Sequence, residues 1–523
     1  MPASSSLLSL PTPTAAQPVI AWRGLHGAAV SLALAEALSR AQGTVVIVAQ
    51  TAARAEQLLR ELAFFASDIE IASFPDYETL PYEAISPPKD LLADRLSVLY
   101  KLAAGDSVKL VVNAEALLGR LPPADFVLSH SLDLSVGEEI DRDALTAKLV
   151  EHGYLRVSQV AEPGEIAVRG AVIDIYPAGS KRAVRIDLFD REIESLRLFD
   201  PETQVADTEH QRVSILPARE FPFDEAAIRH FRQRFREEFP VEPGRCPVYR
   251  DISDAQLPAG IEYYLPLFLD RTVSLLDYLP ADSLILICDG ALDGLIDAEA
   301  LIRDRYEQMR HDTERPVLGP EAAFHSPDGI RRGIDDRPSV RLTGQPVEGV
   351  SEVADARSAH PLAGGVVDDA NRITRWIEAG DAERSLVVAS SAGRREVLLE
   401  LLRSRGYEVS AASGWRDFIG RDDALMVAAG ELDDGLSLPA AGIRIVTAEQ
   451  LGLERPRQQS RRRSRAKDPE SIIRELSDLQ IGAPVVHEQH GVGRYQGLTT
   501  LDVDGVETEF LLLEYADGDK LYV

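Results

Sequence analysis

The chain has 523 residues, 45% of them hydrophobic and 27% charged, which is typical of globular protein and leaves room for about three or four domains. Its 56 Lys and Arg residues against 85 Asp and Glu residues give a formal net charge of −29. Because phosphate contacts need clustered cations, this balance argues against nucleic acid wrapped over most of the surface. Basic patches on proteins are favoured as partners, although acidity alone also serves solubility.

Cysteine usage and apolar runs bear on the cellular location. Cys246 and Cys288 stand in unrelated contexts and form neither a disulfide framework nor a paired-cysteine zinc pattern. The first twenty residues contain Pro11, Pro13 and Pro18 but no Lys or Arg, so they do not have the pattern of a secretory signal. No apolar run reaches the length of about 18 residues that a membrane-spanning helix needs. We therefore expect a cytoplasmic protein, most simply a monomer, without membrane contact.

Residues 1–127 alternate between short apolar runs and amphipathic segments. A run such as 44–49 is typical of a buried parallel strand, and the segment that follows it has apolar residues at helical spacing. The alternation predicts a doubly wound α/β lobe of the kind that binds nucleotides. The predicted strands are 19–22, 44–49, 69–74 and 109–113, and the predicted helices are 28–41, 51–66 and 90–104.

The first turn of this lobe, residues 23–30, lies where a phosphate-binding loop would be expected. It contains Gly24 and Gly27, but none of the seven lysines of the chain follows a glycine. A working loop needs that Lys on the β- and γ-phosphates and a Ser or Thr on Mg²⁺. The second nucleotide motif is degenerate too, since Asp289 is followed by Gly290 and not by an acid. We therefore interpret Gly24 and Gly27 as a degenerate nucleotide loop, and we assign the chain no catalytic residue, metal or cofactor.

Residues 128–215 predict an inserted domain. Asp141 can cap the N-terminus of a helix over 141–152, and Gly153 can end it. A helix followed by antiparallel strands is typical of a small α+β domain. The predicted strands are 166–168, 171–177, 184–189 and 193–199.

The lobe is predicted to resume over 216–349, with helices at 223–239 and 292–309 and a strand at 284–289. Residues 316–346 are rich in Pro and Gly and weakly periodic, so a boundary region is expected there. A small α/β domain without evident chemistry is predicted over 350–454. Its strands are 385–389 and 443–447, and its helix is 393–404.

A basic linker, residues 455–478, is predicted next. Its cations could contact DNA phosphates. The segment has no aromatic side chain to stack on bases, so a solvated tether is the simpler interpretation. The cations are Arg455, Arg457, Arg461, Arg462, Arg463, Arg465 and Lys467.

Residues 479–523 predict a β-rich module. Three short strands are separated by glycines, of which Gly491 and Gly493 can adopt a positive φ for a tight bend. Asp504-Gly505 between β-rich runs is a strong signal for a two-residue hairpin. The pattern predicts a small β-barrel that is partial here, because the sequence stops before the barrel could close.

Several of these stretches resemble one protein family. His-Gly-Val-Gly-Arg-Tyr at 490–495 and Lys-Leu-Tyr-Val at 520–523 resemble the RNA-polymerase-interacting domain of the bacterial transcription-repair coupling factors, Mfd; a related module occurs in the CarD regulators. Residues 74–83 and 259–268 resemble the first lobe of the excision-repair helicase UvrB and its counterpart in Mfd. The pattern over 169–189 resembles the domain that UvrB and Mfd share. The degenerate nucleotide motifs favour Mfd over UvrB.

The resemblance implies a function and partners. Arg169, Arg185 and Phe189 match the family's UvrA-binding residues, and Leu501 matches its contact with the β subunit of RNA polymerase. The implied function is transcription-coupled nucleotide-excision repair, in which stalled polymerase is bound and UvrA is recruited to the lesion. The family's ATP-driven translocase on double-stranded DNA, which uses ATP and Mg²⁺, has no counterpart in these residues. We therefore expect a non-enzymatic N-terminal fragment of a larger ATP hydrolase.

Other interpretations of the function stay open. The chain could be a CarD-like polymerase-binding regulator without a repair role, a UvrB-type helicase, or a passive scaffold. Arg185 could simply pair with an acid across a strand while Phe189 is core, and the Leu501 face could pack into its own module.

Two groups of residues are not interpreted as functional sites. His487 and His490 favour a structural role over a metal site, and the other histidines have no partner at metal spacing. The paired acids at 422–423 and 433–434 are interpreted as solvated loops. The histidines without such a partner are His130, His152, His210, His230, His311, His325 and His360.

Overall fold

The computed structural model describes residues 7–8, 10–180, 182–201, 203–343, 374–377, 383–452, 484–487, 491–503, 506–515 and 520–522. The chain divides into two compact units, Met1–Pro456 and Arg457–Val523. Each unit is described by itself. Within the described ranges, no helix is both long and apolar enough to cross a lipid bilayer.

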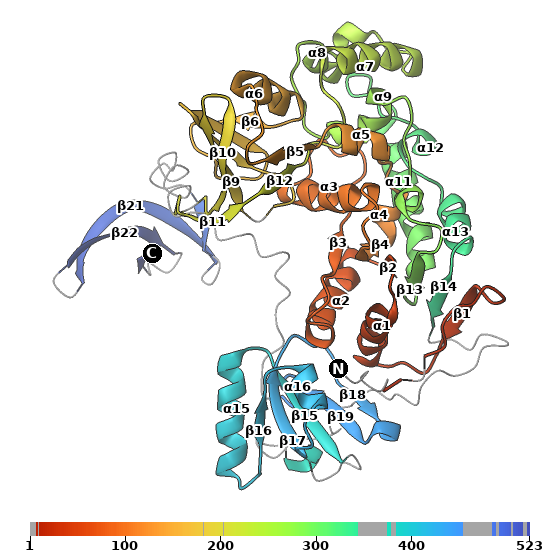
Figure 1. Cartoon of the computed structure of the whole chain (residues 1–523), viewed down its shortest axis with the longest axis vertical. Helices are drawn as coiled ribbons and strands as arrows, with labels where there is room; N and C mark the ends of the chain where they lie inside the picture. The colour runs from red at the N-terminus through yellow and green to blue at the C-terminus, as the bar shows by residue number, and fades with distance from the viewer. Residues whose placement is uncertain are drawn as a thin grey trace. The chain divides into compact units, whose positions relative to one another are not determined.

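The first unit begins with a lobe built on a six-stranded sheet (Figure 1). Its strands are β1 (Val19–Trp22), β2 (Val45–Ala49), β3 (Ala72–Phe74), β4 (Lys109–Asn113), β13 (Leu284–Ile287) and β14 (Ser339–Leu342). Its longer helices are α1 (Ala29–Arg40), α2 (Ala52–Phe65), α3 (Lys89–Ala103), α7 (Glu225–Glu238), α11 (Ala291–Met309) and α13 (Pro327–Asp335). Shorter helices are α4 (Ala114–Leu118), α5 (Ala124–Ser129), α8 (Pro247–Ser253), α9 (Leu265–Phe268), α10 (Leu275–Tyr278), α12 (Pro320–Ala323), η1 (Pro243–Arg245) and η2 (Ile261–Tyr264).

The lobe sheet is parallel throughout, in the order β1-β14-β13-β2-β4-β3. Alternate residues of β2 enter two different cores. Val46 and Val48 pack with residues of α3, α4 and α11, while Val45 and Ile47 pack with α1 and α2. Helices therefore cover both faces, so the continuous apolar run of β2 is buried on both sides, as predicted for a doubly wound sheet.

The Pro- and Gly-rich stretch 316–346 contains more regular structure than the boundary region that was predicted. Up to residue 343 it forms α12, α13 and β14, and β14 pairs with both β1 and β13. Its prolines are compatible with helices because Pro327 stands in the first turn of α13, where no N–H is needed, and Ser326 caps that turn by accepting from the Gly329 N–H.

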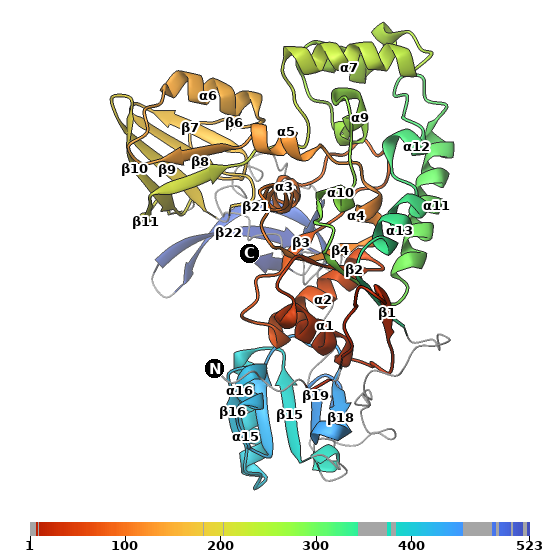
Figure 2. The ribbon, with the colours of Figure 1, turned by 45° about the vertical axis from the view of Figure 1, so that its right-hand side comes forward.

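The inserted domain contains a second six-stranded sheet, in the order β11-β10-β9-β8-β7-β6 (Figure 2). Its elements are β5 (Leu132–Ser135), α6 (Arg142–Glu151), β6 (Leu155–Arg156), β7 (Glu165–Arg169), β8 (Val172–Tyr176), β9 (Ala183–Phe189), β10 (Glu192–Phe199), β11 (Ala206–His210) and β12 (Arg212–Ile215). The sequence predicted α6 and the four strands β7 to β10. It did not predict β5, β6, β11 or β12. As predicted, Asp141 caps α6 by accepting from the Asp143 and Ala144 N–H groups.

A buried ion pair joins α3 to the segment that follows the inserted domain. Arg95 of α3 donates from Nε to Glu220 Oε1 at 2.7 Å, and the two side chains are 2% and 1% exposed. The Arg95 guanidinium also lies 4.3 Å above the Phe74 ring and 4.6 Å above the Tyr77 ring. Tyr77 Oη donates to Glu220 Oε2 at 2.7 Å, so both carboxylate oxygens are engaged. The two halves of the lobe, before and after the inserted domain, are thus connected by a desolvated network.

Two further carboxyl groups, the half-buried Glu115 and the buried Glu262, predict a pH dependence of stability. Burial raises the pKa of Glu115 and of Glu262 to about 7, and the charge of Asp76 adds to the effect at Glu115. From the ordinary pKa of 4.5 up to about 7, the folded chain retains protons that the unfolded chain has released. The free energy of unfolding therefore falls as the pH rises through this window. Above about pH 7, these two groups lower it no further.

Replacing Glu115 with Gln removes the ionisation and is expected to raise the free energy of unfolding at pH 8 by up to about 3 kcal/mol, with little change at pH 5. Urea unfolding at the two pH values measures the difference. Glu400→Gln, at an exposed position in the small domain, is the control and should match the parent at both. Equal pH slopes for Glu115→Gln and the parent would contradict the assignment.

The small domain after the lobe contains a five-stranded sheet in the order β16-β17-β15-β19-β18. Its elements are β15 (Arg384–Ala389), α15 (Ala392–Ser404), β16 (Ser410–Ala412), α16 (Trp415–Ile419), β17 (Leu425–Ala429), β18 (Leu436–Leu438), η3 (Pro439–Ala441) and β19 (Ile443–Thr447). α15 covers one face, where Leu398 and Leu402 pack with Val387 and Val427. The predicted β15, α15 and β19 are confirmed, whereas β16 to β18 were not predicted.

The second unit contains an antiparallel sheet of β20 (Pro484–His487), β21 (Gly491–Val503), β22 (Val506–Glu514) and β23 (Lys520–Tyr522). Val503 pairs with Val506, which confirms the predicted two-residue hairpin. The predicted bend at Gly493 is wrong, because Gly493 pairs with Val485 inside the continuous β21. The irregularity lies at Gly497, whose φ is 116° and where the register against β22 shifts.

Candidate partner-binding surfaces

Asp174 holds two of the predicted site residues on the inserted sheet. The Arg185 guanidinium donates from Nε to Asp174 Oδ1 at 2.7 Å and from Nη2 to Oδ2 at 2.9 Å, and Arg169 Nη2 also donates to Oδ2. The hydrogen bonds to Asp174 raise the pKa of Arg185. Asp174 is 1% exposed, Arg185 is 19% exposed and Arg169 is 48% exposed. Of the two arginines, Arg169 therefore has more of its surface available to a partner.

Strand alternation decides which side chains share this face. Val184, Ile186 and Leu188 enter the core beneath α6. Arg185, Asp187 and Phe189 alternate with them and therefore lie on the opposite face. Asp187 accepts from Arg197 Nη2 at 2.6 Å and from Ser195 Oγ at 2.7 Å, so the face is ordered by pairs that run across the strands.

Phe189 is the third predicted residue and is 73% exposed. It pairs with Glu192 at the end of the β9–β10 hairpin, where Asp190 turns the chain with a φ of 59°. The β7–β8 turn lies at the same end of the sheet, because the Leu188 N–H donates to the Ala171 carbonyl. Phe189 and Arg169 therefore share one face and one end of the sheet. The alternative in which Phe189 is core is wrong, although Arg185 does pair with an acid across a strand.

Leu501 lies in β21 opposite Thr508 of β22. On its other side, β21 pairs with β20 only from Gly491 to Arg494 among the residues with described positions. The basic residues of 455–467, together with His490, Asp504 and Gly505, fall outside the described ranges.

The predicted degenerate nucleotide loop connects β1 to α1. Gly24 and Gly27 have φ values of 76° and 56°, so both glycines occupy the left-handed region. The Ala29 N–H donates to His26 O at 3.1 Å and the Ala28 N–H to Gly435 O at 3.2 Å. These amides at the start of α1 already have backbone acceptors.

Three comparisons with protein families match successive parts of the chain. Residues 132–221 match the UvrB interaction domain, residues 379–451 the MFD D3 domain, and residues 479–523 the CarD-like/TRCF RID domain. The transcription-repair-coupling factor of Escherichia coli K12 is 36% identical over 507 residues, which are 95% of this chain and 44% of that protein. Over nearly its whole length, this chain is similar to transcription-repair-coupling factors. The resemblance inferred from the sequence is confirmed.

Two other coupling factors show the same extent of similarity. That of Haemophilus influenzae is 35% identical over 94% of this chain and 43% of its own length. That of Bacillus subtilis is 25% identical over 96% of this chain and 44% of its own length. The chain thus spans less than half the length of these coupling factors.

The histidines of this coupling-factor-like chain do not all stand apart. His130 and His152 lie with their ring centroids 4.9 Å apart and their planes tilted by 45°, although their positions in the sequence gave no sign of this contact. Burial lowers the pKa of His152 to about 4 and also lowers that of His130, so both rings are neutral near pH 7. Within the described residues, no group of three His, Cys, Asp or Glu side chains is placed to hold a metal.

The paired acids at 422–423 and 433–434 lie in loops, as predicted, and Asp422, Asp433 and Asp434 are exposed, but three of the four also have specific partners. Asp423 accepts from Ser410 Oγ at 2.5 Å and from Arg421 Nε at 3.0 Å. Asp433 lies 3.8 Å from Arg60 of α2, and Asp434 accepts from Gln450 Nε2 at 2.6 Å. The loop over 433–434 therefore contributes to contacts within the first unit.

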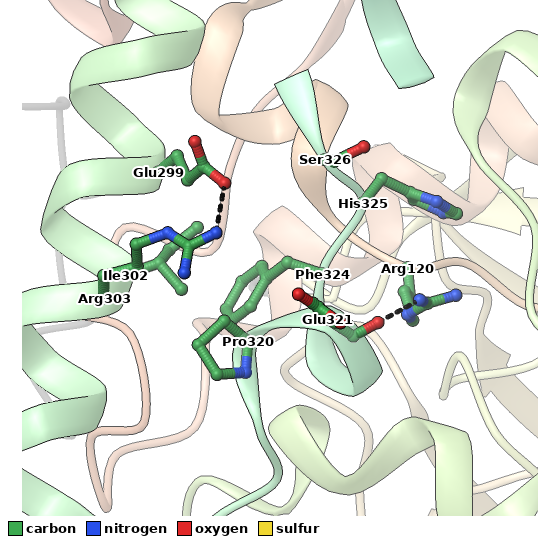
Figure 3. A pocket seen from close by; sticks show the side chains of 9 residues that line it. All are labelled: Arg120, Glu299, Ile302, Arg303, Pro320, Glu321, Phe324, His325 and Ser326. Atoms are coloured by element: carbon green, nitrogen blue, oxygen red, sulfur yellow. Dashed lines mark hydrogen bonds and ion pairs between the residues drawn. The ribbon is translucent and has the colours of Figure 1, made fainter. Parts of the chain in front are cut away.

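A cavity of about 410 Å³ lies between α11 and the α12–α13 segment (Figure 3). Its cations are already engaged. Arg303 pairs with Glu299 at 2.9 Å, and Arg120 donates to Thr272 Oγ1 and to the Glu321 carbonyl. We assign no ligand to it. The lining residues are Arg120, Glu299, Ile302, Arg303, Pro320, Glu321, Phe324, His325 and Ser326.

Proposed function

We propose that this chain couples stalled transcription to nucleotide-excision repair by binding the β subunit of RNA polymerase and UvrA. The observation that carries the UvrA half is the exposed Phe189, which shares a face and an end of the sheet with Arg169 in a domain similar to the UvrB interaction domain. An exposed aromatic ring near an arginine is typical of a binding hot spot. Because Arg169 is more exposed than Arg185, although Asp174 holds both, we assign contact to Arg169 and Phe189 and a positioning role to Arg185.

The polymerase half rests on residues 479–523, which are similar to the CarD-like/TRCF RID domain. Leu501 is the proposed contact residue. Residues 498–503 of β21 pair with β22 and, among the described residues, have no strand on their other side. Such an edge can add to the sheet of a partner through main-chain hydrogen bonds.

The finer architecture is also a proposal. Residues 1–127 and 216–349 would form a helicase-like lobe without ATPase activity, interrupted by the UvrA-binding domain at 128–215. The parallel sheet and the missing Lys after Gly27 support it. The small domain would span 350–454, the basic linker 455–478 and a partial barrel 479–523. The cations of the linker would contact DNA phosphates. ATP and Mg²⁺ would serve translocase domains that these residues do not include.

A crossed binding experiment tests both halves. Purified UvrA and RNA polymerase are titrated separately against the whole chain carrying Phe189→Ala or Leu501→Arg. Phe189→Ala is expected to weaken UvrA binding by about 10–30-fold or more and to leave polymerase binding unchanged, because hot-spot truncation costs about 2 kcal/mol or more. Leu501→Arg is expected to abolish polymerase binding and spare UvrA.

Each variant is the folding control for the other. Val205→Ala, at a position of the same domain that is 60% exposed, provides a matched surface control for Phe189→Ala. Undiminished UvrA binding by the Phe189→Ala variant would contradict the assignment of this surface to UvrA. Unchanged polymerase binding by the Leu501→Arg variant would contradict the assignment of Leu501 as a polymerase contact.

A further inference from the structure

The small domain has one apolar face that its own helices do not fill. Leu386 and Val388 of β15 and Met426 of β17 belong to the same buried core as residues of α1 and α2 in the lobe. Phe65 of α2 and Trp415 of α16 meet edge to face, with ring centroids 5.2 Å apart. The small domain and the lobe therefore share a core.

The loop after β17 lies against α2. A Cβ placed on Gly430 would lie 2.3 Å from Phe64 Cδ2 of α2, so only glycine allows this approach. Arg60, on the same helix, lies 3.7 Å from Glu431 and 3.8 Å from Asp433. Packing and charge thus hold residues 430–433 against α2.

The same loop reaches the first turn of α1. The Gly435 carbonyl accepts from the Ala28 N–H at 3.2 Å. Gln450 fixes the loop from inside the small domain, because its Oε1 accepts from the Gly435 N–H at 2.9 Å and its Nε2 donates to Asp434 at 2.6 Å. In a doubly wound nucleotide-binding fold, the helix N-terminus after the first strand is where a phosphate oxygen accepts from backbone N–H groups.

We propose that the small domain is a built-in plug of the lobe: the loop over 430–435, held against α2, places the Gly435 carbonyl at the phosphate position at the start of α1 and keeps that position closed to nucleotides. The Gly435 carbonyl takes the place of a phosphate oxygen. This closure is a different effect from the absence of the Lys. The Lys would neutralise the charge of a bound nucleotide, whereas the loop blocks access to the site. The closure also gives the small domain a role that does not depend on UvrA or polymerase binding.

Gly430→Leu tests the plug in the whole chain. The added side chain must displace the loop from Phe64, whereas Gly393→Leu, on α15 with nothing within 4 Å of its Cβ, is the matched control. Hydrogen exchange followed by mass spectrometry is expected to show amides of residues 24–32 exchanging at least tenfold faster in Gly430→Leu and unchanged in Gly393→Leu. Unchanged exchange at 24–32 in Gly430→Leu would overturn the proposal.

A second arm tests exclusion of nucleotides. Ala28→Lys restores the Lys after Gly27, and with the plug in place it should bind no fluorescent ATP analogue; binding by this single variant would also overturn the proposal. Should Gly430→Leu fail to fold, Gln450→Ala takes its place, because it removes only the anchor of the loop. The same faster exchange is then expected at 24–32, and its absence counts against the plug.

Discussion

Replacing Arg95 with Leu is expected to lower the free energy of unfolding by about 3–5 kcal/mol, the usual cost of breaking a buried pair. The substitution leaves the Glu220 carboxylate 1% exposed, with Tyr77 as its remaining side-chain donor among the described residues. It also removes the cation from the faces of the Phe74 and Tyr77 rings. Urea unfolding followed by circular dichroism measures the loss.

A matched surface change separates this effect from the loss of any arginine. Arg331→Leu, at an exposed position on α13, should change stability by less than about 0.5 kcal/mol. The double variant Arg95→Leu, Glu220→Leu should recover most of the loss, because it leaves no unpaired buried charge. A loss below about 1 kcal/mol in Arg95→Leu would place the pair among ordinary surface ion pairs and contradict its assignment.

Replacing Asp174 with Leu is the second change with a large expected effect. It removes the shared acceptor of Arg169 and Arg185, so the inserted domain is expected to lose about 2–4 kcal/mol of stability. Under the proposed function, affinity for UvrA falls as well, because Arg169 is no longer fixed beside the hairpin that carries Phe189. Hydrogen exchange in 165–189 and titration with UvrA measure the two losses.

Asp187→Leu is the matched control on the same face. Asp187 also pairs with an arginine, but it is 20% exposed and its partner Arg197 is 38% exposed. Solvent screens such a pair, so a cost of about 0–1 kcal/mol is expected. Equal destabilisation by the two substitutions would show that the burial of Asp174 is not what makes it important.

The sequence predicted the elements whose pattern is local. The unbroken apolar run of β2 and the alternation of β9 each determine one kind of strand, and Asp504-Gly505 determines a hairpin. β14 was missed because it follows a Pro-containing helix in a stretch that is rich in Pro and Gly. Its burial comes from strands far away in the sequence, which no local pattern reports.

The candidate binding surfaces, too, were predicted only in part from the sequence. The resemblance supplied Arg169, Arg185 and Phe189, but the pairing of both arginines with Asp174 depends on the register of three strands. That register is a tertiary property, and it changes the interpretation of Arg185 from contact to positioning. The contact of Gly435 with Ala28 was likewise beyond reach, because a backbone carbonyl carries no residue-type signal.

The order of strands in the lobe sheet has a consequence for synthesis on the ribosome. β14 and β13 lie between β1 and β2, yet they are made last. From Trp22 to Leu342 is about 320 residues, or roughly 16–64 s of elongation at about 5–20 residues per second. The inserted domain emerges within that interval and can fold first. Until β13 and β14 are made, β1 and β2 lack the strands that lie between them in the sheet. A nascent chain paused in this window would be the form most exposed to misassembly and most in need of a chaperone.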